Sequence, residues 1–203
     1  DLGYGYGYPI FNFYGPLPYY FGGLLYSLGA DAILSTKLMF AVGILVSGVT
    51  MFFLGRSLLG NLGGVLALVL FVLAPYHAVQ AYVRGSVGEY WAVAFLPLVF
   101  WGVLSLWKNP KQEWSMVVGG IGLASVVLSH TLIGFVTAML LLGILLFCIL
   151  LRTFRRNLFL LLLLGLSLSA FFWLPAISEM RYTSVKDQIG PTADFRDHFV
   201  CLS

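Results

Sequence analysis

The feature that most constrains this chain is its series of long apolar runs, several of which continue for roughly 20 residues, the length that crosses the hydrocarbon core of a bilayer as a helix. Only 9% of the residues are charged, whereas a soluble domain carries about 25%. That is too little polar surface to cover a water-facing molecule. The runs lack the alternation of period two that marks the strands of a transmembrane barrel. The sequence therefore predicts an all-α fold, a polytopic bundle of transmembrane helices.

Six apolar runs are candidates for spans. They cover residues 33–54, 62–82, 90–107, 114–129, 131–151 and 157–177. The segment 16–29 is apolar and aromatic but is broken by Pro and Gly, so we predict a short interfacial helix there that lies in the plane of the membrane. This divides the chain into an outer loop with the interfacial helix at 1–32, six transmembrane helices at 33–177, and the start of an extracytoplasmic segment at 178–203.

The charges between the runs predict the orientation. Alternate loops on one side hold six of the eleven basic residues and a single acid, Glu113; these basic residues are Arg56, Lys108, Lys111, Arg152, Arg155 and Arg156. The other side holds seven of the eight acids. By the positive-inside rule the basic side is cytoplasmic. The acidic side then faces the exterior, and we expect any chemistry to occur there.

The two ends and the two cysteines add less. The chain begins at Asp1 rather than Met and stops soon after Cys201, so we expect both ends to be cuts in a longer protein and an upstream helix to be missing. Cys148 lies inside an apolar run, and membrane depth separates it from Cys201. We therefore expect no disulfide between them and interpret both as packing residues.

The N-terminal stretch is rich in glycine and tyrosine. Six of the eleven tyrosines fall within the first twenty residues. A tyrosine ring and hydroxyl suit stacking on a sugar or lining a lipid groove, and we assign that role to Tyr6, Tyr8, Asn12 and Tyr14. The competing interpretation is an aromatic belt at the membrane interface, which involves no ligand.

Arg84 and Glu89 stand together in the loop before the third predicted span. Arginine at a membrane boundary can hold a phosphate through two hydrogen bonds, and Glu89 can act as a base or a metal ligand. A structural alternative exists for each. Ser86 followed three residues later by Glu89 fits a helix capping box, and Arg84 can extend to lipid headgroups.

Two other candidate side chains are predicted to lie at the same outer boundary of the membrane as Arg84. His130 sits at the tip of the predicted hairpin between the fourth and fifth spans, where it could donate to a phosphate or shuttle a proton. Arg181 follows the sixth span at the membrane exit. A divalent metal ion is the one cofactor for which the prediction leaves room. Charges at mid-bilayer are missing from all six runs, which argues against an ion-coupled transporter.

Three stretches together resemble a known family. They are residues 5–20 (GYGYPIFNFYGPLPYY), residues 82–89 (YVRGSVGE) and residues 128–130 (LSH). In these the chain resembles prokaryotic membrane proteins labelled 6-pyruvoyl-tetrahydropterin synthase-related, which look like membrane glycosyltransferases of the GT-C type and not like the soluble pterin enzyme. The resemblance extends over essentially the whole chain.

The resemblance implies a multi-pass protein of a prokaryotic plasma membrane that transfers a sugar from a polyprenyl-phosphate carrier to an acceptor on the outer face. Its partners would be membrane lipid and the lipid-linked sugar, with no nucleic acid. The acid that such enzymes carry in the first outer loop normally stands upstream of the Gly-Tyr run, and Asp1 is the one acid left in that loop before the interfacial helix. The resemblance therefore implies Asp1 and Glu89 as candidate catalytic acids. It also implies Arg84, His130 and Arg181 as ligands of the carrier phosphate. The alternatives are a transporter or flippase of a lipid-linked substrate and a noncatalytic membrane scaffold.

Overall fold

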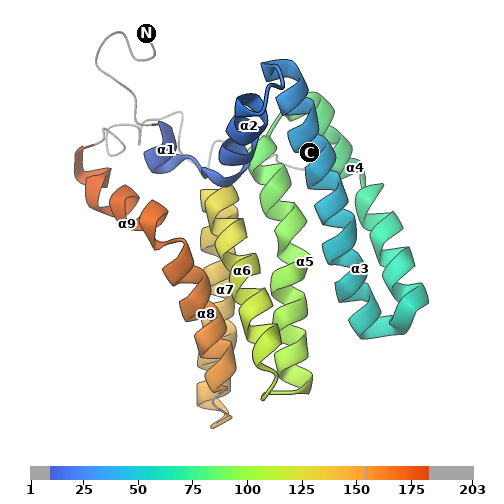
Figure 1. Cartoon of the computed structure of the whole chain (residues 1–203). Coiled ribbons are helices and arrows are strands. Elements are labelled where there is room, and N and C mark those ends of the chain that lie inside the picture. Colours follow the sequence, from blue (N-terminus) through green and yellow to red (C-terminus); the bar gives the residue numbers. More distant parts are fainter. Residues whose placement is uncertain (1–9, 154, 183–203) are drawn as a thin grey trace, which may run out of the picture.

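The computed structural model describes residues 10–153 and 155–182, and all the regular structure in these ranges is helical (Figure 1). The elements in chain order are α1 (Ile10–Phe13), α2 (Leu17–Ser27), α3 (Ala32–Val72), α4 (Pro75–Ala78), the π-helix η1 (Val79–Arg84), α5 (Val87–Lys108), α6 (Glu113–Ser129), α7 (Thr131–Leu150), α8 (Arg156–Leu168), α9 (Ala170–Glu179) and the short 3-10 helix η2 (Met180–Tyr182). The predicted all-α fold is confirmed.

The long helix α3 is a hairpin of two antiparallel arms. Gly60 interrupts it with φ of 74° and ψ of −169°, a conformation that only glycine adopts without strain. Beyond it the chain turns back, so that a Cβ built on Gly48 would lie 3.4 Å from both Leu68 and Val72. In a straight helix these residues would be about 30 Å apart. The first arm corresponds to the first predicted span, 33–54. The second arm ends at Val72 and so covers only about half of the second predicted span, 62–82, which continues through α4 and η1.

The centre of the molecule is the contact of α5, α6 and α8. Small residues let these helices approach closely, as is common in membrane bundles. A Cβ on Gly102 of α5 would lie 2.6 Å from the Cα of Gly119 in α6, and one on Gly119 would lie 2.4 Å from Leu161 in α8. The fully buried side chains of Leu123, Val126 and Leu161 fill the space around these contacts.

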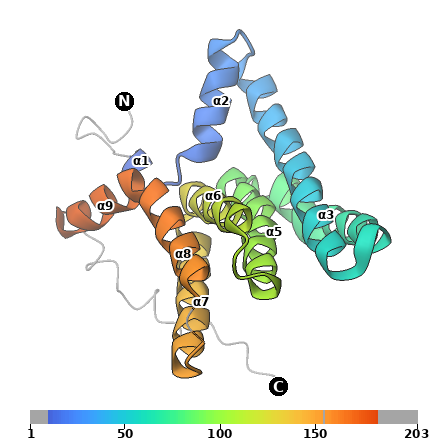
Figure 2. The ribbon, with the colours of Figure 1, turned by 60° about the horizontal axis from the view of Figure 1, so that its bottom comes forward.

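Helix α3 joins this centre through hydrogen bonds to α5. The Trp91 indole donates to the Met39 carbonyl at 2.9 Å, and the Thr50 hydroxyl donates to the Ala94 carbonyl at 2.7 Å. Helix α2 packs on α3 and lies across one end of the bundle: it is foreshortened in Figure 1 and seen lengthwise in Figure 2, where the bundle helices are foreshortened. The helix predicted at 16–29 is present, and its place in the plane of a membrane stays a prediction.

The number of helices that can each cross a bilayer is lower than the six predicted. By length and composition three stretches of the described residues qualify, and a fourth qualifies if a bent pair counts as one. The first stretch, Ala32–Arg84, contains both arms of the α3 hairpin. Helix α6 has only 17 residues, and the predicted sixth span is broken between α8 and α9, which meet at a bend of 67°.

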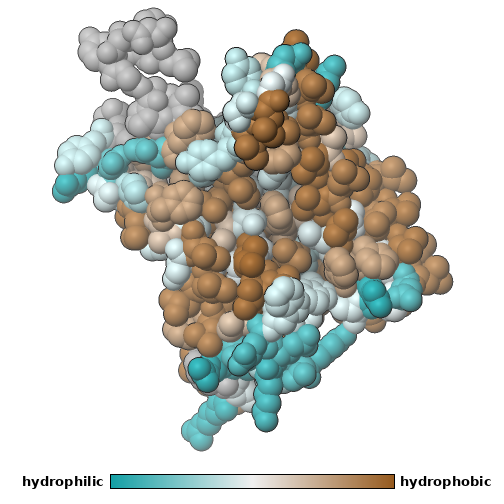
Figure 3. Space-filling view, viewed as in Figure 1, coloured by the Kyte–Doolittle hydropathy of each residue, from teal (hydrophilic) through white to brown (hydrophobic). Residues whose placement is uncertain are grey.

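The charges gather at opposite ends of the bundle. The end that holds Arg56, Lys108, Lys111, Arg152, Arg155 and Arg156, called the basic end below, is the hydrophilic lower border in Figure 3, beneath a broad hydrophobic zone. Lys108 donates to the Ser57 carbonyl there, which ties the hairpin turn to the end of α5. Asp31, Glu89 and Glu179 lie at the opposite, acidic end. Cys148 is buried and free, and Cys201 falls outside the described residues.

Candidate functional site at the acidic end

A π-helix turns Arg84 back toward the start of α5. Ala74 and Pro75 interrupt the second arm of the hairpin, and the chain continues through α4 into η1, Val79–Arg84. Helices of this wide type are rare and frequently occur at functional sites. Gly85 ends η1 in the left-handed conformation, with φ of 60° and ψ of 25°, which favours glycine. This reversal sets Arg84 beside the first turn of α5.

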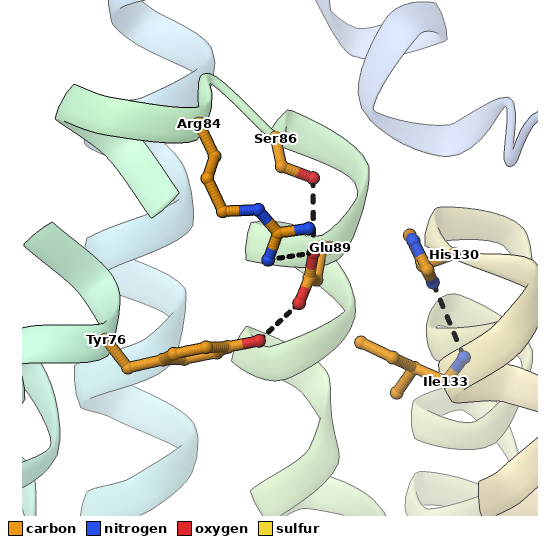
Figure 4. A network of polar contacts seen from close by, with 6 residues as sticks. All are labelled: Tyr76, Arg84, Ser86, Glu89, His130 and Ile133. Carbon is orange, nitrogen blue, oxygen red and sulfur yellow. Dashed lines mark hydrogen bonds and ion pairs between the residues drawn. The ribbon is translucent and has the colours of Figure 1, made fainter. Parts of the chain in front are cut away.

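Glu89 is the centre of a polar cluster that also contains Tyr76, Arg84 and Ser86 (Figure 4). Arg84 Nη1 lies 2.9 Å from Glu89 Oε2, and the Tyr76 hydroxyl donates to Glu89 Oε1. The side chain of Glu89 is 11% exposed and that of Arg84 is 50% exposed. The cluster therefore holds a nearly buried carboxylate against a guanidinium that still faces outward, and the remaining N–H groups of Arg84 can bind an anion.

The capping box that the sequence left open as an alternative for Ser86 and Glu89 is absent. A capping box needs each side chain to bond the other residue's backbone N–H, but Ser86 makes no side-chain cap to α5. Its hydroxyl lies 3.4 Å from Glu89 Oε2, and its backbone N–H donates to the Gln80 carbonyl. The carboxylate is committed to Arg84 and Tyr76 instead. Its role in the structure is an ion pair and not a helix cap.

His130 faces this cluster from the tight corner between α6 and α7 (Figure 4). Its Nδ1 accepts the backbone N–H of Ile133 at 3.4 Å, so the histidine begins α7 as its N-cap. A ring that accepts at Nδ1 carries its proton on Nε2 when neutral. His130 is therefore able to donate from Nε2 to an anion between itself and Arg84.

Two glycines bring the N-terminal loop and α5 onto this corner. A Cβ on Gly15 would lie 2.4 Å from the Ser129 carbonyl oxygen, and a Cβ on Gly88 would lie 2.7 Å from the same atom. Side chains at either position would force these segments apart. The hydroxyl of Thr131 also donates to the Phe13 carbonyl at 3.2 Å. Three stretches that are far apart in the sequence therefore meet at the α6–α7 corner.

A second polar group lies nearby, where α1 packs on α9. The Asn12 amide donates to Glu179 Oε2. Arg181, two residues after Glu179, stacks on the ring of Tyr182, with 4.7 Å from Cζ to the ring centroid. Tyr14 is exposed and meets Tyr19 edge-on at 6.3 Å. Burial and the neighbouring Tyr14 raise the pKa of Tyr19, so its hydroxyl stays a donor.

An open groove of about 640 Å³ lies between the first arm of α3 and the α4–η1 segment. The residues that line it include His77 and Tyr90, which follow Tyr76 and Glu89 of the cluster in the sequence. Most of its lining is apolar, with Phe40, Ile44 and Leu73 among the lining residues. Lys37 and the buried His77 supply the basic groups in the groove. Its shape and chemistry suit a hydrocarbon chain attached to an anionic head.

The predicted site residues thus fall into two neighbouring groups. Arg84 and Glu89 are in contact and His130 faces them, whereas Asn12 and Arg181 lie with Glu179. Asp1, Tyr6 and Tyr8 fall outside the described residues. Sequence reasoning missed Tyr76 as a partner of Glu89 and Glu179 as a partner of Asn12. The only available signal for Tyr76 was a hydroxyl-bearing aromatic directly after Pro75, at the break in an apolar run.

A metal site is not built from the described residues. In 10–153 and 155–182, no group of three or more His, Cys, Asp or Glu side chains could hold a metal ion. No set of residues in those ranges supports the expected divalent ion. Because Asp1 lies outside them, the expectation of a metal ion stays untested.

Comparison with known proteins points to one family. Residues 11–191 match the family described as "6-pyruvoyl-tetrahydropterin synthase related domain; membrane protein". The chain is also 29% identical over 189 residues to a protein of Lactococcus lactis subsp. cremoris (strain MG1363) that carries the name "Uncharacterized protein". That match covers 87% of this chain and 31% of the relative, so the chain spans about a third of the relative's length. No solved structure matches this chain.

Proposed function

The chain belongs to the 6-pyruvoyl-tetrahydropterin synthase related family of membrane proteins, and from this premise we propose that it is part of a membrane glycosyltransferase. The enzyme takes a sugar from a polyprenyl-phosphate carrier and transfers it to an acceptor at the extracytoplasmic face. The observation that carries the proposal is the nearly buried Glu89 carboxylate, held by the half-exposed Arg84, with the next residue, Tyr90, in the lining of a mostly apolar groove. A lipid-linked donor requires such a pairing of a polar centre with a hydrocarbon path.

Each partner in the cluster has a task in this reaction. The carrier phosphate binds the outward N–H groups of Arg84 and the Nε2–H of His130, since a planar guanidinium suits phosphate oxygens. The polyprenyl chain lies in the groove beside Lys37 and His77. The sugar then stands over Glu89, near the aromatic side chains of the N-terminal loop such as Tyr14. Arg84 can hold Glu89 and the phosphate at once, because it has five donors.

The transfer itself moves one bond and one proton. The acceptor hydroxyl attacks the anomeric carbon, the bond from that carbon to the carrier phosphate oxygen breaks, and Glu89 takes the hydroxyl proton as a general base. The carrier phosphate leaves with an additional negative charge, which Arg84 and His130 stabilise. Tyr76 keeps the carboxylate oriented through its hydrogen bond to Oε1.

A transfer assay on membranes tests the proposal. Membranes that contain the full-length protein are incubated with polyprenyl-phosphate hexose labelled in the sugar, and label in the acceptor fraction is measured. We expect transfer that falls at least about 100-fold in Glu89→Gln, in line with the loss of a general base, and that also falls in Arg84→Ala. Arg56→Gln, an exposed cation at the basic end, is the matched control and should retain full transfer.

The same assay separates the alternatives. Label that crosses the membrane on an unchanged carrier would indicate a transporter or flippase. Membranes with neither transfer nor movement, in which Glu89→Gln and Arg84→Ala behave like the unchanged protein, would indicate a scaffold. Either outcome would overturn the glycosyltransferase proposal.

A further inference from the structure

The basic end of the bundle contains a cavity that the proposed reaction does not use. Its volume is about 610 Å³, and it lies between the α5–α6 connection and the start of α8. Six of its nine lining residues are polar or charged: Lys111, Glu113, Thr153, Arg155, Arg156 and Asn157. The Asn157 amide donates to the Pro110 carbonyl at 2.7 Å and closes one wall. Three cations and one acid therefore line one cavity.

The helix ends at this cavity increase its positive potential. Helices α6 and α8 both begin there, and neither has a side-chain cap at its first turn. The N-terminus of a helix is its positive pole, which favours anions and disfavours cations. Arg155 and Arg156 nevertheless stand at the start of α8, with no acid in its first turn. An anion in the cavity would offset this accumulation of positive charge.

The cations of the basic end are not neutralised within the described part of the chain. The only ion pair in those residues joins Arg84 to Glu89 at the other end. Arg155 instead donates from Nη1 to the carbonyls of Leu106 and Trp107, at 3.4 and 3.3 Å, and covers the Trp107 ring at 4.5 Å. Arg155 thereby connects the cavity, which it lines, with Trp107, whose ring it covers.

Trp107 itself lines an apolar groove. It runs between α5 and α7, has a volume of about 600 Å³ and is lined by Val103, Leu104, Trp107, Met139, Leu140, Gly143, Ile144 and Phe147. From Met139 to Phe147 it follows α7 for roughly 12 Å. A Cβ on Gly143 would meet no atom within 4 Å, so the helix leaves open space there.

We propose that the cavity and the groove together bind one anionic glycerophospholipid from the leaflet at the basic end. Its phosphate lies in the cavity against Lys111, Arg156 and the first backbone N–H groups of α8. One acyl chain passes Trp107 and follows the groove over Gly143. The charge of the cavity selects an anionic headgroup over a zwitterionic one, as juxtamembrane basic pockets do. The adjoining groove favours a lipid over a soluble phosphate, which would leave it uncovered.

Fluorescence quenching by brominated lipids tests this site directly. The full chain is reconstituted in dioleoylphosphatidylcholine vesicles, in which a rising fraction of the lipid is replaced by phosphatidylglycerol or phosphatidylcholine brominated on the acyl chains. Bromine quenches a tryptophan that it touches, and the Trp107 signal is isolated by subtracting the Trp107→Phe variant. We expect half-maximal quenching at a phosphatidylglycerol fraction at least threefold lower than the phosphatidylcholine fraction.

Two variants assign the headgroup and the chain separately. Lys111→Gln combined with Arg156→Gln should bring the preference for phosphatidylglycerol close to onefold. Gly143→Leu fills the open part of the groove and should reduce the quenching of Trp107 by both lipids. The matched controls are Arg56→Gln, at the same end outside the cavity, and Gly23→Leu, an exposed helical glycine in α2 with no atom within 4 Å of its Cβ position. Both should behave like the unchanged protein.

Three results would overturn the proposal. Equal quenching by both brominated lipids in the unchanged protein would mean that Trp107 only faces bulk lipid. A preference for phosphatidylglycerol that survives in the Lys111→Gln/Arg156→Gln variant would place the headgroup elsewhere. Loss of the preference on adding inorganic phosphate in excess over the lipid would indicate a soluble phosphorylated ligand.

Discussion

The two ends of the helix bundle treat their charges in opposite ways. At the acidic end the Glu89 carboxylate is nearly buried and is matched by Arg84 and Tyr76. At the basic end Lys111, Arg155 and Arg156 line a cavity, and no ion pair within the described ranges involves them. One end pairs a nearly buried carboxylate with the protein's own side chains, whereas in the described residues the cations that line the cavity at the other end have no carboxylate partner.

The difference indicates which kind of ligand each end can bind. A carboxylate fixed by two partners is preorganised for one geometry, which is the condition for acting on a single reacting group. Exposed cations around a cavity tolerate variation in the position of an anion, which is the condition for holding a mobile lipid headgroup. Stability measurements should therefore respond strongly to single substitutions at the acidic end and weakly at the basic end.

The largest effect is expected from Glu89→Ala. The substitution leaves Arg84 and the Tyr76 hydroxyl without their partner, and we expect a loss of about 2 kcal/mol in the free energy of unfolding, because Arg84 is half exposed and part of the cost of a buried pair is screened. Glu113→Ala, an exposed acid in the first turn of α6, is the matched control and should change it by less than about 0.5 kcal/mol. Thermal unfolding in a neutral detergent measures both. Equal losses would remove the contrast between the ends.

The next effect is expected from Tyr76→Phe, which removes a single donor from Glu89 and preserves the ring. A hydrogen bond to a charged group contributes about 1.5 to 3 kcal/mol when buried, and the partial exposure of Tyr76 should reduce the loss to about 1 kcal/mol. The proposed transfer should fall with it, since the carboxylate loses its orientation. Tyr82→Phe, an exposed tyrosine of η1, is the control. A Tyr76→Phe protein as stable and active as the Tyr82→Phe protein would show that the acidic end is not preorganised by this contact.

A smaller effect, whose sign should depend on lipid, is expected from Arg156→Gln. In a neutral detergent the substitution removes a cation from the positive pole of α8 and should stabilise the protein by a few tenths of a kcal/mol. With phosphatidylglycerol present, the unchanged protein gains stability from the bound lipid, and the variant should gain less. Thermal unfolding at increasing phosphatidylglycerol reveals a crossing of the two curves. Parallel curves would mean that Arg156 does not contact the lipid.

Much of the fold could be predicted from the sequence because apolar run length and loop charge act locally. The runs indicated helices, and the tight corner at His130 and the turn near Gly60 were both implied by the short polar breaks between runs. The number of crossing helices could not be obtained in this way. The bend at Ser169 separates α8 from α9 within one apolar run, and run length alone carries no information on direction.

The candidate site was predictable only in part, for a different reason. Arg84 and Glu89 stand five positions apart, so their contact was within reach of sequence reasoning. Tyr76 reaches Glu89 only because a π-helix and the left-handed Gly85 turn the chain back between them, and no local pattern announces a π-helix. The contact of Asn12 with Glu179 joins residues 167 positions apart and depends on the packing of α1 against α9.

The smallest effect, and the sharpest test of how Glu89 is held, is expected from Ser86→Ala. The Ser86 hydroxyl lies 3.4 Å from Glu89 Oε2, beyond the usual range for a hydroxyl donor, and it caps no backbone N–H of α5. We therefore expect a loss below about 0.5 kcal/mol in thermal unfolding, whereas removal of a true N-cap costs about 1 kcal/mol. Ser178→Ala serves as the control, since its hydroxyl bonds only to the Pro175 carbonyl within α9. A loss that exceeds that of Ser178→Ala by about 1 kcal/mol would mean that the capping box exists. The Glu89 carboxylate would then bond to the backbone N–H of Ser86 instead of pairing with Arg84, and its role would be structural.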